Sequence, residues 1–476
     1  MSTLTTQYVK KEIFRIVSEV ARERGVRAFA IGGYVRDCFL GRVCNDIDIV
    51  VEGSGIEFAR AVGEKTGSYV SYFKNFGTAM LHFEGDEIEF VGARKESYRR
   101  ESRKPIVEDG TLQDDQLRRD FTINAMAFSL QEDSFGELVD PFGGIRDLAA
   151  GIIRTPLDPD TTYSDDPLRM LRAVRFASKL STADHTFTIV PESMESMRRM
   201  AGRLEILSRE RVAEELNKML LCARPSMAFY LMDEAGLLPY ILPQLCALKG
   251  VETIDGRGHK DIFAHTLAVL DNVAAVSDNL WLRWAALLHD VGKAQVKRYE
   301  PGQGWTFHGH DLVGSKMVPK IFASLKLPLD DKLNYVKKLV WLHMRPIALV
   351  DDVVTDSAVR RLLFDAGDDI DDLMTLAGAD ITSRNPVKVA RIRANFELVK
   401  RKLVEVEEKD AIRNFKNPIN GDYVMDLFGI GPCNTIGQLK EYVKEAILDG
   451  RIGNNFEEAD ALMREKAAEM GLTPCK

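Results

Sequence analysis

The sequence predicts a multidomain α+β protein, in which an α/β head with a small mixed sheet precedes all-helical domains. A chain of 476 residues is too long for one hydrophobic core and suggests three or four domains. Apolar runs at 28–31 and 49–51, separated by a glycine turn and a helix-like segment, indicate strand, turn, helix and strand. Residues 259–385 are instead patterned as helices. We expect domains at 1–150, 151–250, 251–390 and 391–476.

Composition excludes several classes of protein. An apolar content of 45% and a charged content of 29% are ordinary for a soluble globular chain. The net charge of −8 means that any contact with nucleic acid must depend on local basic patches. The six cysteines form no Cys-x-x-Cys pair, which argues against a disulfide framework and a zinc knuckle and suits a reducing compartment. Without a signal peptide or a run of ~20 apolar residues, we expect a cytoplasmic protein that contacts no membrane.

The elements of the head follow from apolar periodicity. Residues 8–24 keep apolar side chains at helical spacing and should form an amphipathic helix that covers the sheet beginning at Ala28. A second helix is expected at Ile56–Thr66. Short strands are then expected at Tyr69–Phe73, Thr78–Phe83 and Ile88–Val91.

The most informative stretch is 31–50. Gly32 and Gly33 precede a helix-like segment, so backbone N–H groups could approach a phosphate chain closely. Asp46 and Asp48 lie on one face of the following strand, because side chains alternate with a period of two. Two carboxylates beside a phosphate-binding turn can hold Mg²⁺ against a triphosphate. This pattern predicts nucleotide transfer.

Two alternatives bear on this prediction. Asp-x-Asp is common at strand ends and a lone Gly-Gly is a weak signal, but their order and spacing favour function. Glu89 in a later strand is either a third carboxylate facing the aspartates or a surface glutamate on an edge strand. The sequence leaves these two readings of Glu89 open.

Two arginine-containing segments follow. Arg94–Lys104 is strongly basic; such a run is most often a solvated loop, although a mobile basic loop would suit a growing RNA end. In Leu117–Phe128, Arg119 is suited to bidentate contact with phosphate, and the single Asn124 in an apolar stretch needs hydrogen-bond partners. Asp140–Leu148 has the turn chemistry expected where a domain closes.

A helix expected to begin near Pro167 brings Asp166, Arg169 and Arg172 onto neighbouring faces. Ordinary ion pairing along the helix is one explanation. Base selection is another. A carboxylate can accept from the exocyclic amine of cytosine or adenine while a guanidinium donates to the neighbouring ring nitrogen, so the pair would bind these two bases. Guanine and uracil would leave these charged groups unpaired.

Several long motifs in register resemble a known family. GGYVRD with DID, RRDFTINAMA, DPFGGIRDL, DDPLRMLRAVRF and SRERVAEEL occur in the order found in bacterial-type (class II) CCA-adding tRNA nucleotidyltransferases and their poly(A) polymerase relatives, over about residues 25–245. The resemblance implies that Asp46 and Asp48 are catalytic and carry Mg²⁺. It implies a nucleotide-binding set of Gly32, Gly33, Arg36, Asp37, Arg119, Asp120, Asn124, Asp166, Arg169 and Arg172. The chain departs from the family's Glu-Asp-x-x-Arg pattern at one position, where Asp165 replaces the first acid.

The implied reaction is template-independent CCA addition. The 3′-hydroxyl of tRNA attacks the α-phosphorus of CTP twice and then of ATP, with pyrophosphate leaving, so tRNA, CTP and ATP are the expected partners. A poly(A) polymerase, or an enzyme that adds only CC or only A, would share the head motifs.

Six of the eight histidines fall within residues 259–343, among them the adjacent pair His289-Asp290. Imidazole and carboxylate together suit divalent transition metals. The spacing resembles the HD (His-Asp) metal-dependent phosphohydrolases, which implies a second, phosphohydrolase activity. In that resemblance the core metal ligands are His265, His289, Asp290 and Asp380, and a second ion is held by His310 and His343.

Other readings of the whole chain remain. An HD phosphohydrolase with an inactive, RNA-binding head is one competitor, but the presence of Asp46, Asp48, Arg119 and Arg169 argues against it. A non-catalytic scaffold would require those carboxylates to be incidental. At the C-terminus, Asn420–Asn455 resembles the family's tail, which implies contact with the tRNA elbow, although a simple loop–helix cap is the alternative.

Overall fold

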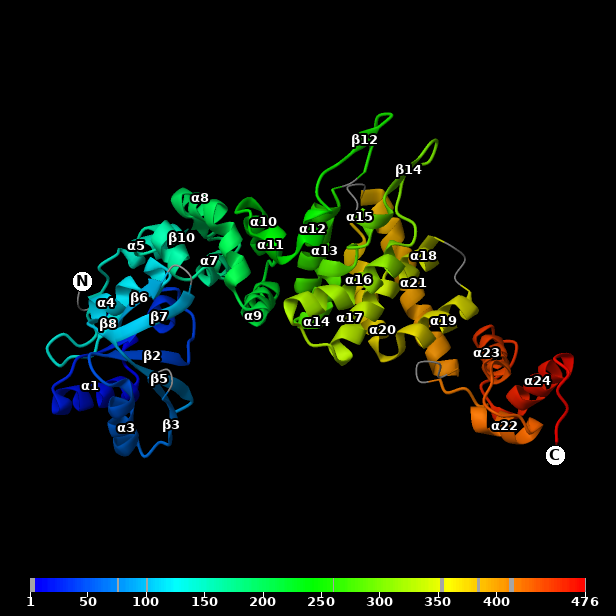
Figure 1. The fold of residues 1–476 in the computed structure, drawn as a ribbon, viewed down its shortest axis with the longest axis horizontal. Coiled ribbons are helices and arrows are strands. Elements are labelled where there is room, and N and C mark those ends of the chain that lie inside the picture. The colour runs from blue at the N-terminus through cyan, green and yellow to red at the C-terminus, as the bar shows by residue number, and fades with distance from the viewer. Residues whose placement is uncertain are drawn as a thin grey trace. The chain divides into compact units, whose positions relative to one another are not determined.

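A computed structural model of the chain describes residues 5–74, 77–99, 102–259, 261–351, 355–382, 386–410 and 415–475 (Figure 1). The chain divides into two compact units, Met1–Pro243 and Gln244–Lys476. The predicted boundary at residue 250 lies close to this division. The predicted domain boundaries at 150, 250 and 390 stay predictions.

The first unit is built on a seven-stranded mixed sheet. Its strands are β1 Ala28–Ile31, β2 Asp46–Val51, β3 Val70–Phe73, β4 Thr78–Phe83, β5 Asp86–Gly92, β8 Ala127–Ser129 and β9 Leu138–Val139. They are ordered β3-β4-β5-β2-β1-β8-β9. The β2–β5 pair is parallel and the other pairs are antiparallel. The predicted small mixed sheet is confirmed.

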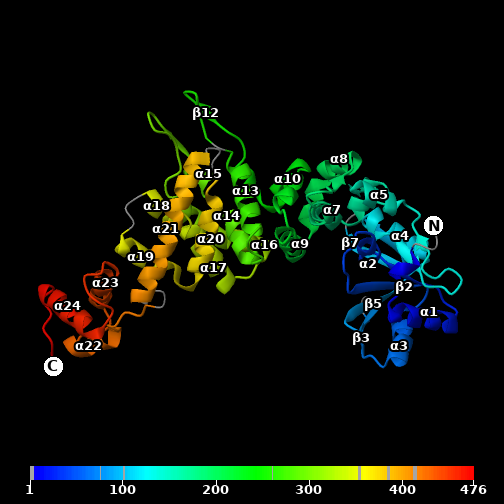
Figure 2. The same cartoon turned by 180° about the vertical axis from the view of Figure 1, so that it is seen from behind.

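Helices α1 Glu12–Arg24 and α3 Gly55–Thr66 pack against each other beside the sheet (Figures 1 and 2). Helix α1 buries Ile13, Val17 and Val20 of the predicted apolar stripe and also Phe14, which the spacing did not predict, whereas the predicted Ile16 is only half-buried. It begins four residues later than expected, because Lys11 has an extended backbone and Thr6–Tyr8 form a separate 3-10 turn.

The expected basic loop at Arg94–Lys104 was wrong. Strands β6 Arg94–Arg99 and β7 Ser102–Asp109 pair as an antiparallel hairpin. The register sets Arg94 opposite Asp109 and Lys95 opposite Glu108, so acidic residues of the second strand offset the basic run. Sequence periodicity along one strand cannot reveal this cross-strand compensation.

Helices dominate the rest of the first unit. Helix α2 Gly33–Phe39 follows β1, and α4 Leu112–Leu117 follows the hairpin. The helices beyond the sheet are α5 Gly144–Ala150, α6 Pro159–Asp165, α7 Leu168–Leu180, α8 Pro191–Met200, α9 Arg209–Leu220, α10 Ser226–Glu234 and α11 Leu238–Ile241. Helix α7 begins directly after Pro167, as predicted. A short parallel pair, β10 Ile152–Ile153 with β11 Thr188–Ile189, departs from the expected all-helical neck.

The second unit is mostly helical. Its helices include α13 Ile262–Ala274, α14 Leu280–Leu288, α15 Lys293–Val296, α16 His310–Leu325, α17 Asp331–Leu342, α18 Met344–Asp351, α19 Asp356–Ala366, α20 Ile370–Asp380 and α21 Pro386–Asp410. Helices α22 Gly421–Phe428, α23 Asn434–Leu448 and α24 Phe456–Glu469 end the chain. None of the helices described is both long enough and apolar enough to cross a membrane.

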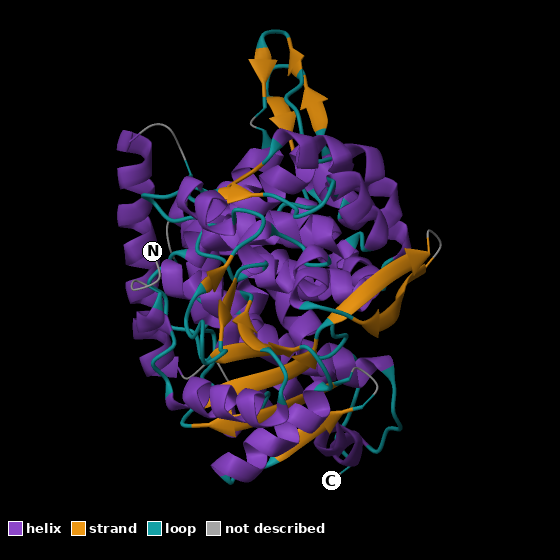
Figure 3. Ribbon diagram, turned by 90° about the vertical axis from the view of Figure 1, so that its left-hand side faces the viewer, coloured by secondary structure: helices purple, strands orange, loops and turns teal. Residues whose placement is uncertain are grey.

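Two antiparallel hairpins depart from the expected all-helical pattern in this unit. They are β12 Thr253–Ile254 with β13 Arg257–Gly258, and β14 Arg298–Glu300 with β15 Gly304–Thr306. Figure 3 shows them projecting together from the same side of the helices. The Tyr299 hydroxyl of one hairpin donates to Asp255 Oδ2 of the other at 3.0 Å, which ties them together.

Candidate functional site

The glycine turn after β1 meets the aspartate strand directly. Ile31, the last residue of β1, is the register partner of Asp48 on β2. Gly32 has a φ of +81°, and a Cβ added there would lie 3.3 Å from Asp48 Oδ2 and 2.8 Å from Arg119 Nη1. The glycine therefore supplies both the backbone conformation and the space that let a carboxylate and a guanidinium approach the main chain.

Three carboxylates gather on one face of the sheet. Asp46 and Asp48 share a face of β2, and parallel pairing sets Glu89 of β5 directly beside Asp48. Strand β5 lies between β4 and β2, so the reading of Glu89 as an edge-strand residue is wrong. Its role as a metal ligand stays a prediction.

The electrostatics of this face favour a cation. Burial raises the pKa of Asp48; the guanidinium of Arg119 opposes the shift, and the carboxylate of Asp46 adds to it. Burial and then the charge of Asp48 raise the pKa of Glu89. Ile31 beside Asp48 belongs to a buried apolar cluster, which explains the desolvation. Oxygen ligands crowded in this way are the donor set that hard divalent cations take.

Arg119 is held at the turn by a buried carboxylate. Asp115, which is fully buried, pairs with Arg118, and its Oδ2 accepts from Arg119 Nε at 3.2 Å. Arg119 Nη1 also donates to the carbonyl of Asn124 at 3.3 Å. We did not single out Asp115 from the sequence, although its position four residues before Arg119, starting within α4, was a detectable signal.

Arg36 and Asn124 form a buried network with their neighbours. Arg36 is only 5% exposed; its Nη1 donates to Asn124 Oδ1 at 2.7 Å and its Nε to Asp37 Oδ1 at 2.9 Å. Asn124 Nδ2 then donates to Asp120 Oδ1 at 3.0 Å. The buried Asn124 is thus satisfied, as its setting requires. The structure places Arg36 in this bracing network, engaged by protein groups.

Asp120 joins that network to α7. Its Oδ2 accepts from Arg172 Nε at 2.7 Å and forms an ion pair with Arg172 Nη2 at 2.6 Å. Burial by itself would raise the pKa of Asp120, but the guanidinium of Arg172 and the Asn124 amide bring it down to about 2. Asp120 is therefore ionised at neutral pH and fixes the guanidinium of Arg172.

The start of α7 carries the other two predicted residues. Asp166 lies two residues before the first residue of the helix, and its Oδ1 accepts from Leu168 N, the first amide of α7, at 3.1 Å. Arg169 Nη2 donates to the carbonyl of Arg118 at 2.5 Å. Helix α7 is held in turn by α9, through a buried ion pair of 2.6 Å between Arg175 Nε and Glu215 Oε2. The bonds of Arg169 and Arg172 to residues of the segment Leu117–Phe128 therefore join this segment to α7, the predicted base-reading helix.

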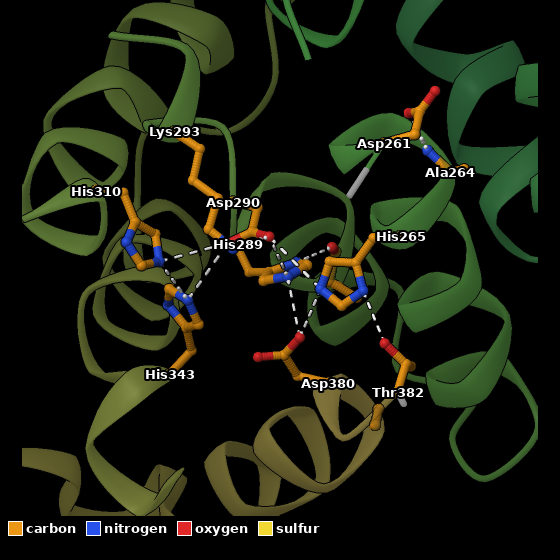
Figure 4. Close-up of polar contacts among 12 residues, drawn as sticks. Asp261, Ala264, His265, His289, Asp290, Lys293, His310, His343, Asp380 and Thr382 are labelled. Carbon is orange, nitrogen blue, oxygen red and sulfur yellow. Dashed lines mark hydrogen bonds and ion pairs between the residues drawn. The ribbon is translucent and has the colours of Figure 1, made fainter. Parts of the chain in front are cut away.

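The second unit gathers the predicted histidines and aspartates around one centre (Figure 4). His265 comes from α13, His289 and Asp290 follow α14, and Asp380 ends α20. His310 begins α16 and His343 follows α17. Residues from five helix segments therefore converge, although they are far apart in the sequence.

Asp290 bridges two groups of ligand atoms. Its Oδ2 lies 3.3 Å from His289 Nε2 and 3.6 Å from His265 Nε2. Its Oδ1 lies 3.4 Å from His310 Nε2 and 3.8 Å from His343 Nε2. In each group the three ligand atoms lie within 4.8 Å of one another. This arrangement suits two neighbouring cations that share one carboxylate.

Unsatisfied buried atoms show that the cluster fits metal ions. His289 Nε2 and Asp290 Oδ1 are buried and make no hydrogen bond within the part of the chain that the structure describes. Such groups are costly unless they are paired or coordinate a metal. Burial lowers the pKa of His343 to about 4 and also lowers that of His310, which keeps both imidazoles in the neutral, metal-binding form.

Positive charge stabilises the buried carboxylate of Asp290. Burial alone would lower the pKa of His289, but Asp290 raises it to about 10. Lys293 Nζ lies 2.7 Å from Asp290 Oδ2 and was not among the residues that we predicted. A cavity of about 640 Å³ opens onto His265, Asp380 and Lys293. The hairpin residue Trp305 and its neighbour Phe307 line the same cavity.

Comparison with known proteins gives the family. Profiles described as "Poly A polymerase head domain", "Probable RNA and SrmB- binding site of polymerase A" and "HD domain" match residues 28–154, 186–249 and 262–383. The chain is 36% identical over 335 residues to the multifunctional CCA protein of Ralstonia nicotianae, covering 68% of this chain and 73% of that protein. The chain belongs to the CCA-adding tRNA nucleotidyltransferase and poly(A) polymerase family.

Further relatives agree with this assignment. The A-adding tRNA nucleotidyltransferase of Deinococcus radiodurans is 34% identical over 368 residues, covering 75% of this chain and 80% of the relative. A tRNA nucleotidyltransferase solved with a primer tRNA and an incoming ATP analog has a TM-score of 0.57 and 25% identity, covering 81% of this chain and 98% of that one. A CCA-adding enzyme solved with ATP shares the fold with a TM-score of 0.64, covering 98% of each chain at 23% identity.

The family resemblance seen in the sequence is confirmed, including its HD domain. Both families represented in the chain are metal-dependent. The roles of the individual residues stay predictions, since the comparisons name families and whole proteins.

Proposed function

We propose that this chain adds CCA to the 3′ ends of tRNA, using CTP and ATP and releasing pyrophosphate, without a nucleic-acid template. One observation carries the proposal: Asp48 and Arg119 meet at Gly32, with Asp46 and Glu89 on the same face of the sheet. Carboxylates that bind a cation thus adjoin a guanidinium that can bind phosphate.

Mg²⁺ is the ion that this oxygen-rich set would hold, and when bound it would neutralise charge on the reacting oxygens. Asp46 and Asp48 are the proposed ligands, and Arg119 orients the triphosphate at the glycine turn. Asp166 and Arg169 at the start of α7 read the base. Asp120 forms an ion pair with Arg172 and so holds helix α7 against the segment Leu117–Phe128. Catalysis by these residues is chiefly positioning and charge stabilisation.

We propose a second activity, a metal-dependent phosphohydrolase, at the histidine cluster. The bridging geometry of Asp290 supports it, as does the 640 Å³ cavity in front of the ligands. Imidazole-rich ligands favour a divalent transition metal here over Mg²⁺. His265, His289, Asp290 and Asp380 are the proposed ligands of one ion; His310, His343 and the shared Asp290 are those of the other.

The cytoplasm is the proposed location. All six cysteines are free thiols in the part of the chain that the structure describes, which suits a reducing compartment. The C-terminal helices α22–α24 are proposed to contact tRNA away from the reacting 3′ end.

The test supplies tRNA lacking its CCA end with Mg²⁺ and each nucleoside triphosphate, alone and mixed, and sequences the product ends. The proposal predicts CC with CTP alone, CCA with CTP and ATP together, and no extension with GTP or UTP. A single added A, CC alone in the mixture, or a long A tract would replace it with the corresponding partial enzyme or a poly(A) polymerase. Hydrolysis of a phosphoester is assayed in parallel with Mn²⁺.

A further inference from the structure

Three of the four clustered histidines have their ring orientation fixed by the main chain. His289, His310 and His343 each donate Nδ1–H to the carbonyl three residues earlier, which belongs to Ala286, Phe307 and Val340, at 2.7–2.8 Å. A carbonyl can only accept, so each of these rings carries a proton on Nδ1, which leaves Nε2 as the nitrogen that faces the cluster. No side-chain substitution removes these carbonyl partners.

His265 differs from the other three. It lies within α13 rather than at a helix boundary. Inside a helix, the main-chain carbonyls already accept hydrogen bonds from main-chain N–H groups. Its Nδ1 instead meets the Thr382 hydroxyl, with Oγ1 at 2.8 Å, from a residue 117 positions later in the chain (Figure 4). Among the described residues of the cluster, His265 is the histidine whose Nδ1 contact comes from a side chain.

Thr382 is itself held beside a predicted ligand. Helix α20 ends at Asp380, and the Thr382 amide donates back to the Asp380 carbonyl at 2.7 Å. Asp380 Oδ1 lies 2.8 Å from His265 Nε2. One three-residue segment therefore contacts both nitrogens of the same imidazole, through a hydroxyl on one side and a carboxylate on the other.

We propose that Thr382 is a positioning residue that accepts Nδ1–H from His265 and so directs its Nε2 at the metal. This inference rests on the proposed metal site of the second unit. Loss of the hydroxyl leaves the ring free to rotate or to change its tautomer. The affinity for the ion held by His265, His289, Asp290 and Asp380 therefore falls. The ion held by Asp290, His310 and His343 is unaffected, because main-chain carbonyls orient the histidines of that group.

The test compares Thr382→Val, which keeps the shape and removes the hydroxyl, with Thr382→Ser, which keeps the hydroxyl. Thr375→Val is the matched control, because Thr375 lies within the preceding helix α20 and its hydroxyl donates to the Asp371 carbonyl at 2.9 Å. Full-length protein is stripped with a chelator and titrated with Mn²⁺ by calorimetry. Thr382→Val should raise the Kd of one bound Mn²⁺ by about 10- to 100-fold, while Thr382→Ser and Thr375→Val stay near the wild type.

Three outcomes overturn the proposal: an unchanged Kd in Thr382→Val, a Thr382→Ser variant as weak as Thr382→Val, or equal weakening of both ions. Unaltered thermal melting and CTP incorporation confirm that each variant is folded. Failure of the phosphohydrolase proposal is separate, since it would show as normal Mn²⁺ binding by the wild type without phosphoester hydrolysis. A wild-type chain that bound Mn²⁺ only at the proposed site of Asp46 and Asp48, and none at the histidine cluster, would refute the metal site of the cluster and this inference together.

Discussion

Substituting Gly32 by alanine tests how closely the glycine turn, Asp48 and Arg119 must approach. With a φ of +81° and a ψ of −129° at Gly32, a residue with a Cβ is strained by about 1–3 kcal/mol. The new methyl group would also lie 2.8 Å from Arg119 Nη1 and 3.3 Å from Asp48 Oδ2. Both side chains must therefore retreat, Arg119 by roughly 0.5–1 Å to reach ordinary contact distance.

A displacement of that size at reacting groups lowers rates by up to about 100-fold. We expect kcat/KM for CTP to fall by about 10- to 100-fold in Gly32→Ala, measured as incorporation of labelled CMP into tRNA lacking its CCA end. Gly41→Ala is the matched control, since Gly41 has a φ of +64° and nothing within 4 Å of its added Cβ. It introduces a Cβ at a positive φ without the clash. Equal activity in the two variants, at equal loss of stability, would refute the proposed approach of Asp48 and Arg119.

Three further predictions concern single side chains. Asp48→Asn should abolish CMP incorporation yet stabilise the fold by about 1 kcal/mol at pH 7, because burial raises the pKa of Asp48 in the folded state and ionisation there is unfavourable. This gain should shrink as the pH falls below that raised pKa, and a thermal melt with no gain at pH 7 would contradict the electrostatic argument. Asp166→Ala should relax selection among the four nucleoside triphosphates, measured by competition; unaltered selectivity would remove Asp166 from base reading. His289→Ala should eliminate phosphoester hydrolysis and spare CCA addition, whereas His308→Ala, at an exposed histidine, should leave both intact; parallel loss of both activities in His289→Ala would show that the two sites are not independent.

Local patterns predicted the aspartate strand well. Asp46-Ile47-Asp48 forms the start of β2 as expected, since alternation of buried and exposed side chains is a local property. The beginning of α7 after Pro167 was also predictable from a local property, because proline is favoured at the start of a helix. The family motifs added the expected order of the domains.

What the sequence did not reveal depends on contacts between distant segments. Asp120 was expected among the nucleotide-binding residues, but its carboxylate is paired with Arg172 and Asn124. The bracing pair of Arg175 and Glu215 joins helices 40 positions apart. The hairpin that begins at Arg94 forms by pairing of β6 with β7. Trp305 is positioned by pairing of β14 with β15. The sequence of one strand does not show which strand it pairs with.

The two aspartates of β2 are most directly tested by CMP incorporation into tRNA lacking its CCA end. Asp46→Asn and Asp48→Asn are compared with the wild type and with Asp133→Asn, a substitution at an exposed position outside the predicted site. The account predicts incorporation at background level in the first two variants, with a folded chain by thermal melting, and wild-type incorporation in the third. Sustained incorporation by either Asp46→Asn or Asp48→Asn would contradict it.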